Sequence, residues 1–123
     1  MENRQNGRLT LGRNGEDIAA DYLKRLRYRL LARSFRLGRG EIDIVARDGA
    51  TIVFIEVKTR TDSEHGPPEE AVTAAKQAQI RKVAEGFLIR RRVAADTPCR
   101  FDVLSVRFGD GGLPIVHHIK DAF

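Results

Sequence analysis

The fold of this chain is decided by one stretch, residues 41–60, which reads EIDIVARDGATIVFIEVKTR. Both halves are rich in β-branched and aromatic residues, and Asp48-Gly49 between them is a strong signal for a tight β-hairpin. The second half is almost continuously apolar, which is typical of a central strand that is covered on both faces. The stretch therefore predicts two antiparallel strands, 41–47 and 51–59, at the centre of a sheet.

The hairpin register decides which charged residues meet, because side chains alternate between the two faces of a strand. Either register that a tight turn allows puts Asp43 on the same face as Glu56 and Lys58, and one register sets Asp43 directly opposite Glu56. Two carboxylates and an ammonium group then converge at the end of an apolar strand, where unpaired charges are costly to bury. A divalent cation relieves the repulsion between the carboxylates, and Mg²⁺ prefers such oxygen ligands.

Two helices are expected to add charged residues to the same place. Apolar residues recur at helical spacing over residues 9–27, and Glu16 continues the inward-facing row of this helix. A second helix is expected over residues 67–92, because prolines and acids suit a first helical turn. Lys76 lies inside the apolar stripe of this second helix. Both charged residues are therefore expected on the buried side, at the border of the acidic patch.

Three further strands complete the predicted sheet, over residues 28–35, 100–108 and 113–119. The element order is then α-β-β-β-α-β-β, which indicates an α/β protein with a mixed sheet flanked by helices. Residues 1–8 are polar and are expected to form a flexible N-terminus. Residues 9–123 are expected to form a single domain, since domains cluster near ~100–150 residues.

The composition narrows the classes of function. The 123 residues include 22 Lys and Arg against 17 Asp and Glu, and the net charge of +5 favours a polyanionic partner. With only 6 Phe and 2 Tyr, the chain offers no stacking platform for single-stranded bases, so duplex or branched nucleic acid is favoured. No apolar stretch approaches the ~20 residues that cross a membrane, and the N-terminus lacks a signal sequence, so we expect a cytoplasmic protein.

Each charged motif also has a simpler explanation when it is taken alone. A Glu-x-Lys tripeptide is most often an exposed ion pair on a strand. Glu16 alone suits a first-turn acid that complements the helix dipole, and Lys76 alone suits a snorkelling side chain. Glu41 is as readily a solvated acid at a strand start as a third ligand. The functional interpretation therefore rests on the convergence of these residues on Asp43.

The motifs taken together resemble those of the YraN family (uncharacterised protein family 0102). They are GRNGE at residues 12–16, GEIDIV at 40–45, FIEVKTR at 54–60, Ala71-Val72 with Lys76, and RFDV at 100–103. The resemblance covers nearly the whole chain from Gly12 onward. It implies a restriction-endonuclease-like fold with a core α-β-β-β-α-β, similar to that of archaeal Holliday-junction resolvases, and a metal site on the central hairpin.

The resemblance also implies roles for particular residues. By motif position, Asp43 corresponds to the aspartate of the superfamily, and Glu56 and Lys58 correspond to its Glu-x-Lys pair. Glu16 matches the acid that resolvase-like members supply from the first helix. One departure from the pattern is that Ile42, rather than a proline, precedes Asp43. The catalytic residues implied by the resemblance are Asp43, Glu56, Lys58 and Glu16.

The implied chemistry is metal-dependent hydrolysis of phosphodiester bonds. Mg²⁺, or Mn²⁺ in its place, is expected to be held by Asp43, Glu56, the backbone carbonyl of Val57 and Glu16. Lys58 is expected to orient the attacking water and to stabilise the developing charge. Contacts to phosphates, which position nucleic acid without reading its sequence, are expected from Arg13, Arg60, Lys76 and Arg81.

The expected function is therefore that of an endonuclease acting on double-stranded DNA, including branched or junction DNA. Two alternatives remain open at the level of sequence. One is a nucleic-acid-binding module without catalysis, in which the acidic patch is vestigial. The other is a protein–protein interaction domain whose basic surface keeps it soluble. Resolvases often act as dimers because junctions have paired strands, so a homodimer is a further expectation.

Overall fold

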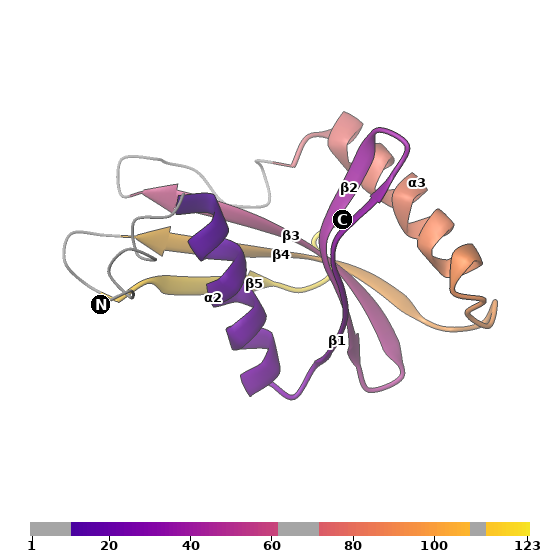
Figure 1. The fold of residues 1–123 in the computed structure, drawn as a ribbon, viewed down its shortest axis with the longest axis horizontal. Coiled ribbons are helices and arrows are strands. Elements are labelled where there is room, and N and C mark those ends of the chain that lie inside the picture. The colour runs from indigo at the N-terminus through magenta and orange to yellow at the C-terminus, as the bar shows by residue number, and fades with distance from the viewer. Residues whose placement is uncertain (1–10, 62–71, 109–112) are drawn as a thin grey trace.

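The structure, a computed structural model, describes residues 11–61, 72–108 and 113–123, with side chains described for residues 15–60 in the first range. The elements in chain order are α2 (Leu11–Arg25), β1 (Arg29–Leu37), β2 (Gly40–Asp48), β3 (Thr51–Thr61), α3 (Ala74–Arg90), β4 (Cys99–Phe108) and β5 (Ile115–Ile119). This order confirms the predicted mixed α/β class, a five-stranded sheet flanked by two helices (Figure 1). The predicted flexible segment 1–8 lies outside the described residues. No described helix is long and apolar enough to cross a membrane.

The sheet has the strand order β1-β2-β3-β4-β5, in which β3 and β4 are parallel and the other neighbours are antiparallel. The central hairpin is closed by a two-residue loop after the pair Asp48↔Thr51. Gly49 takes the first loop position with φ 62°, a conformation that favours glycine. This loop fixes the register that continues the ladder from Ile44↔Ile55 toward Asp43 and Glu56.

Two hydrophobic cores lie on opposite faces of the sheet. β3 separates them, because its successive side chains alternate between the two faces. Val53 and Ile55 pack with the buried face of α2, whereas Ile52 and Phe54 pack with the buried face of α3. In Figure 1, α2 crosses in front of β3 and β4, while α3 lies beside β2. Since residues 52–56 are all buried, β3 is the covered central strand that its apolar sequence predicts.

The strands β2 and β3 separate before either of them ends. Their ladder stops at the pair Ile44↔Ile55. Beyond this point β2 stays paired with β1 as far as Gly40, and β3 stays paired with β4 as far as Thr61. Figure 1 shows the resulting fork, with the β1–β2 hairpin turning away from β3 and β4. The fork leaves a gap in the sheet at the position of Asp43, through which groups from both faces can meet.

The helix ends differ from the predicted ones by a few residues. α2 ends at Arg25 rather than at residue 27, because Arg27 has φ 71° and the Tyr28 N–H bonds back to the Leu23 carbonyl. α3 begins at Ala74, after the N-cap Thr73, whose Oγ1 accepts a hydrogen bond from the Lys76 N–H. The described residues just before the cap are not helical, so the prediction of a helix from residue 67 was wrong for them. The prolines of the predicted start lie outside the described residues.

A buried polar network joins both ends of the described chain. Asp102 on β4 is fully buried, and its carboxylate accepts hydrogen bonds from the Arg100 guanidinium at 2.9 and 3.0 Å. His118 Nε2 on β5 lies 2.7 Å from the other side of this carboxylate, and its Nδ1 lies 3.2 Å from the Tyr22 hydroxyl on α2. The network therefore fixes β5 against both the sheet and the first helix.

Candidate functional site

Asp43 lies at the fork, where its side chain bonds to β3 in place of a backbone hydrogen bond between the two strands. Its Oδ2 accepts a hydrogen bond of 2.8 Å from the Val57 N–H on β3. On the other side it faces Ser34 of β1, which has φ 52° and lies between the paired positions Arg33↔Ile44 and Phe35↔Ile42. On β2, Ile42 packs in the α3-side core whereas Ile44 packs in the α2-side core, so the strand does not keep strict alternation around Asp43.

Three carboxylates gather around this position. They come from Glu16 on α2 and from Glu41 and Asp43 on β2, and one ligand oxygen from each lies within 4.8 Å of the others. Glu16 reaches the group because Gly15, in the second turn of α2, lets the helix dock closely on β3. A Cβ at Gly15 would collide with the Oγ1 of Thr59 and would lie 3.3 Å from its Cβ. The absence of a side chain at residue 15 therefore places Glu16 close to Glu41 and Asp43.

The arginines near this group lie at its solvent side. Arg33 lies 3.6 Å from Glu16 and 2.9 Å from Asp17, with 41% of its own side chain exposed. Arg36 lies 3.4 Å from Glu41 and is 76% exposed. Ion pairs of such exposure are screened by water and stabilise the fold little. Within the described part of the chain, Asp43 has no ion pair with a lysine or arginine at this level of contact.

Glu56 lies on the other side of Asp43 and is shared by two lysines. Its side chain is only 8% exposed, and its Oε2 lies 3.7 Å from Lys58 Nζ and 3.8 Å from Lys76 Nζ. Lys58 is its neighbour on the same face of β3, whereas Lys76 comes from the first turns of α3. The predicted meeting of β3 and α3 charges at this point is therefore present in the structure.

The pKa values of three carboxyl groups at this point, Glu16, Asp43 and Glu56, are all raised above their ordinary values. Burial, followed by the charge of Asp43, raises the pKa of Glu56 to about 7, against the opposing effect of Lys76 and Lys58. Burial also raises the pKa of Asp43, and the Glu41 charge adds to this, while the Val57 N–H opposes it. The pKa of Glu16 is raised by burial and by Asp43, with Arg33 opposing. A cation placed among them would reverse these shifts.

Of the residues predicted to hold a cation, Glu16 and Asp43 belong to the group of three carboxylates. Glu41 is the third member of that group, while Glu56 is not in it and interacts with both Asp43 and the two lysines. The signal for Glu41 is its spacing of two residues from Asp43, which favours the same strand face. The Val57 carbonyl faces the same gap as its N–H, because both groups of a residue in an extended strand point to one edge.

The other predicted phosphate contacts are spread over the molecule. Lys76 is at the site, whereas Arg60 is buried within β3 at 8% exposure. The Arg81 guanidinium stacks over the Phe101 and Phe123 rings, at 4.5 and 5.6 Å from their centroids, rather than at the acidic cluster. Arg13 lies in α2, but its side chain is outside the described residues.

The donor set of the cluster fits a hard divalent cation. Three carboxylates from two elements already lie close enough to share one ion, and a backbone carbonyl and a fourth carboxylate lie beside them. Mg²⁺ takes oxygen ligands of this kind and needs few of them from protein, because it keeps several waters. No described histidine or cysteine joins the group, which disfavours a zinc site.

Comparison with known proteins gives a consistent result over most of the chain. The model of the uncharacterised protein family UPF0102 matches residues 15–106. A UPF0102 protein of Geobacter metallireducens is 54% identical over 114 residues, which cover 93% of this chain and 92% of the relative. A UPF0102 protein of Symbiobacterium thermophilum is 44% identical over 113 residues, which cover 92% of this chain and 95% of the relative. The matched residues include every residue of the acidic cluster.

Proposed function

The chain belongs to the uncharacterised protein family UPF0102, and we propose that it is a divalent-cation-dependent endonuclease that hydrolyses phosphodiester bonds in DNA. The observation that supports this most strongly is the meeting of three carboxylates with the Glu56–Lys58 pair at the fork between β2 and β3. Carboxylates suited to a cation, placed beside ammonium groups suited to a phosphate, are the combination that metal-assisted hydrolysis requires.

Mg²⁺, with Mn²⁺ as a substitute, is the cation that these oxygen donors suit. The residues that would hold it are Glu16, Glu41 and Asp43, with Glu56 and the Val57 carbonyl as further ligands from β3. When bound, it would supply Lewis-acid stabilisation of the charge on the phosphate.

The lysines would act on the phosphate and the attacking water. Lys58 and Lys76 lie within 4 Å of Glu56 and also act on the charge of Asp43; a divalent cation that neutralised the carboxylates would leave both ammonium groups available to an anion. Lys58, with 30% of its side chain exposed, would donate hydrogen bonds to the attacking water and to the developing phosphorane. Lys76, 39% exposed, would hold a phosphate from the α3 side.

We expect the substrate to be double-stranded or branched DNA. The net charge of +5 favours a polyanion, and the few aromatic residues disfavour stacking of single-stranded bases. The likeness of the motifs to those of junction resolvases supports a restriction-endonuclease-like domain that recognises DNA shape. Such an enzyme would work in the cytoplasm, and the predicted homodimer would present two sites to paired strands.

The test is a cleavage screen over duplex, single-stranded, flap and four-way-junction DNA, with Mg²⁺, Mn²⁺ or EDTA. Wild-type protein should cut at least one branched or duplex form, only when a divalent cation is present. Asp43→Asn, Glu56→Gln and Lys58→Gln should each lower the rate by about 10²-fold or more, as loss of a group that stabilises the transition state does.

Two exposed acids serve as matched controls. Asp17→Asn lies beside Glu16 in sequence and pairs with the same arginine, and Glu85→Gln lies on the exposed side of α3. Both should cut at the wild-type rate. Cleavage that survives both Asp43→Asn and Glu56→Gln would refute the proposed site. Wild-type protein that binds DNA tightly but cuts no form with any cation would instead support the non-catalytic binding module.

A further inference from the structure

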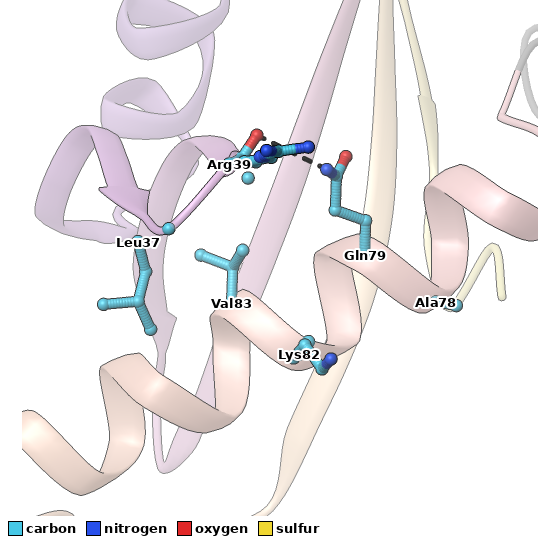
Figure 2. Close-up of a pocket in the computed structure, with 8 residues that line it drawn as sticks. Leu37, Arg39, Ala78, Gln79, Lys82 and Val83 are labelled. Atoms are coloured by element: carbon cyan, nitrogen blue, oxygen red, sulfur yellow. Dashed lines mark hydrogen bonds between the residues drawn. The ribbon is translucent and has the colours of Figure 1, made fainter.

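A groove of about 540 Å³ lies between the β1–β2 turn and α3, apart from the acidic cluster (Figure 2). Its apolar part is formed by Leu37 from the hairpin and Val83 from the helix. Its cations are Arg39 from the turn and Lys82 from α3, and both residues are exposed. None of the described residues that line it is acidic. The groove is therefore a positively charged cleft with an apolar base.

The walls of the groove are held at a fixed distance. Figure 2 shows Gln79 reaching from α3 toward the turn, where its Nε2 donates a hydrogen bond of 3.4 Å to the Arg39 carbonyl. Gly40 lies so close to the helix that a Cβ there would collide with Val83 and would lie 3.1 Å from the Gln79 side chain. A hairpin docked this closely presents a preformed surface, which lowers the entropic cost of binding a ligand.

The two elements that form the walls of the groove, β2 and α3, also carry residues of the proposed active site. On β2, Asp43 lies three residues after Gly40, with Glu41 between them, and this is about 10 Å along the strand. On α3, Gln79 lies one turn after Lys76, which is about 4.5 Å along the helix axis. Cations lie at both places, with Lys58 and Lys76 at the fork and Arg39 and Lys82 at the groove.

We propose that this groove binds the sugar–phosphate backbone of the DNA strand next to the phosphate that is cut. The inference rests on the proposed function, because it takes the acidic cluster as the point of cleavage. Arg39 and Lys82 would neutralise flanking phosphates, and the apolar base would accept a sugar. Two pairs of cations at separate places on the same elements suit a regularly charged polymer better than the side chain of a single acidic residue.

The first experiment measures binding without cleavage. Fluorescence anisotropy of a labelled DNA duplex and a labelled four-way junction is recorded in EDTA, over a series of salt concentrations. Arg39→Gln with Lys82→Gln should weaken binding about tenfold or more and reduce the slope of log K against log salt by about 2. The matched control, Lys24→Gln with Arg25→Gln, removes two exposed charges at the far end of α2 and should bind like wild type.

The second experiment locates the contact on the DNA. Neutral methylphosphonates are placed one at a time along the strand, and each substrate is titrated with wild-type protein and with the double variant. One or two positions should weaken wild-type binding and lose this effect in the double variant, as expected for a direct contact. A series with no such position overturns the proposal. The proposal is also overturned if binding of an oligoglutamate peptide depends on Arg39 and Lys82 while binding of DNA does not.

The outcomes for the groove and for the active site are separable. If wild-type protein cuts DNA and the groove variants bind and cut normally, the groove proposal fails while the proposed function stands. If no form of DNA is cut but binding still depends on Arg39 and Lys82, the nuclease assignment fails while the groove remains a nucleic-acid site. Thermal unfolding of each variant shows that the exposed substitutions leave the fold intact.

Discussion

Asp43 has a structural task as well as its proposed chemical one, and this determines how it should be replaced. Its Oδ2 accepts the Val57 N–H beyond the last pair of the β2–β3 ladder. Removing the acceptor would leave a buried donor unsatisfied, which costs about 1–3 kcal/mol. Asn keeps an acceptor oxygen but removes the charge. Asp43→Asn therefore separates loss of cation binding from loss of the fork, whereas Asp43→Ala would not.

The first prediction concerns the protonation of Glu56 in the absence of divalent cations. Its pKa is raised to about 7 in the fold, chiefly by burial, from an ordinary value of 4.5. A carboxyl with a raised pKa stabilises the fold while protonated, and this contribution is lost as the pH rises from about 4.5 through about 7. The free energy of unfolding, measured with urea, should therefore fall between ~pH 5 and ~pH 8 by up to about 3 kcal/mol.

Glu56→Gln isolates the contribution of this carboxyl. The amide is neutral at every pH, so the variant should lose less stability than wild type over the same range and should be the more stable of the two at ~pH 8. Glu85→Gln removes an exposed acid from α3 and should keep the wild-type dependence. Parallel pH curves for wild type and Glu56→Gln would show that burial does not hold Glu56 protonated.

At the level of elements, the contact between α2 and β3 sets the position of Glu16. Gly15→Ala adds a methyl group that would collide with Thr59. We expect the variant to lose about 1–3 kcal/mol of unfolding free energy, as overpacked sites do, although alanine favours a helix by about 1 kcal/mol over glycine. Because the helix must shift, Mn²⁺ affinity should fall as well, which calorimetric titration measures.

A double-mutant cycle tests whether the collision is the cause. Thr59→Ala removes the Oγ1 and Cγ2 of Thr59 and leaves only its Cβ, 3.3 Å from the new methyl group. Gly15→Ala combined with Thr59→Ala should therefore recover most of the lost stability, while Gly15→Ala with the equally bulky Thr59→Val should recover none. Equal stability of the two double variants would exclude this contact as the reason for the glycine.

The elements that the sequence predicts best are those specified by local chemistry. The loop after Asp48 fixes the strand register, and the apolar run of β3 identifies the central strand. The start of α3 was predicted too early, since prolines and acids suit a loop as well as a first helical turn. Thr73 decides the start through its side-chain oxygen, which caps the Lys76 N–H. Capping depends on backbone angles that composition does not reveal.

The site was predictable in its strand residues and less so in its long-range details. Alternation and turn chemistry give the correct register and bring Asp43 near Glu56, although the ladder ends one pair earlier, at Ile44↔Ile55. The grouping of Glu41 with Glu16 and Asp43 depends on how β2 separates from β3 and on where α2 docks, and neither can be read from a local motif. Arg81 was assigned to phosphate because of its charge, whereas its location over two aromatic rings is a matter of tertiary structure.

On the scale of the whole molecule, one carboxylate ties β4 to β5 and to the C-terminal residues, and through His118 to α2. Asp102 is fully buried on β4 and also accepts the Asp121 N–H, at 3.0 Å, near the C-terminus. Burial acts to raise the pKa of Asp102, but the bonds from His118 and Arg100 outweigh it, and the pKa is lowered. The contribution of Asp102 to the free energy of unfolding is therefore present above about pH 3.8, its ordinary pKa. It is lost as the pH falls through the lower pKa of the folded state.

The last prediction compares the two aspartates that pair with Arg100. Asp102→Asn should lower the free energy of unfolding by about 3–5 kcal/mol, because it leaves a guanidinium of 18% exposure without its buried partner. Asp48→Asn removes a partner at 3.1 Å that is 39% exposed, and it should cost no more than about 1 kcal/mol. Urea unfolding at ~pH 7 measures both. Equal losses would mean that Asp102 stabilises the chain only as a surface ion pair does, and that β5 is held by its strand pairing with β4 instead.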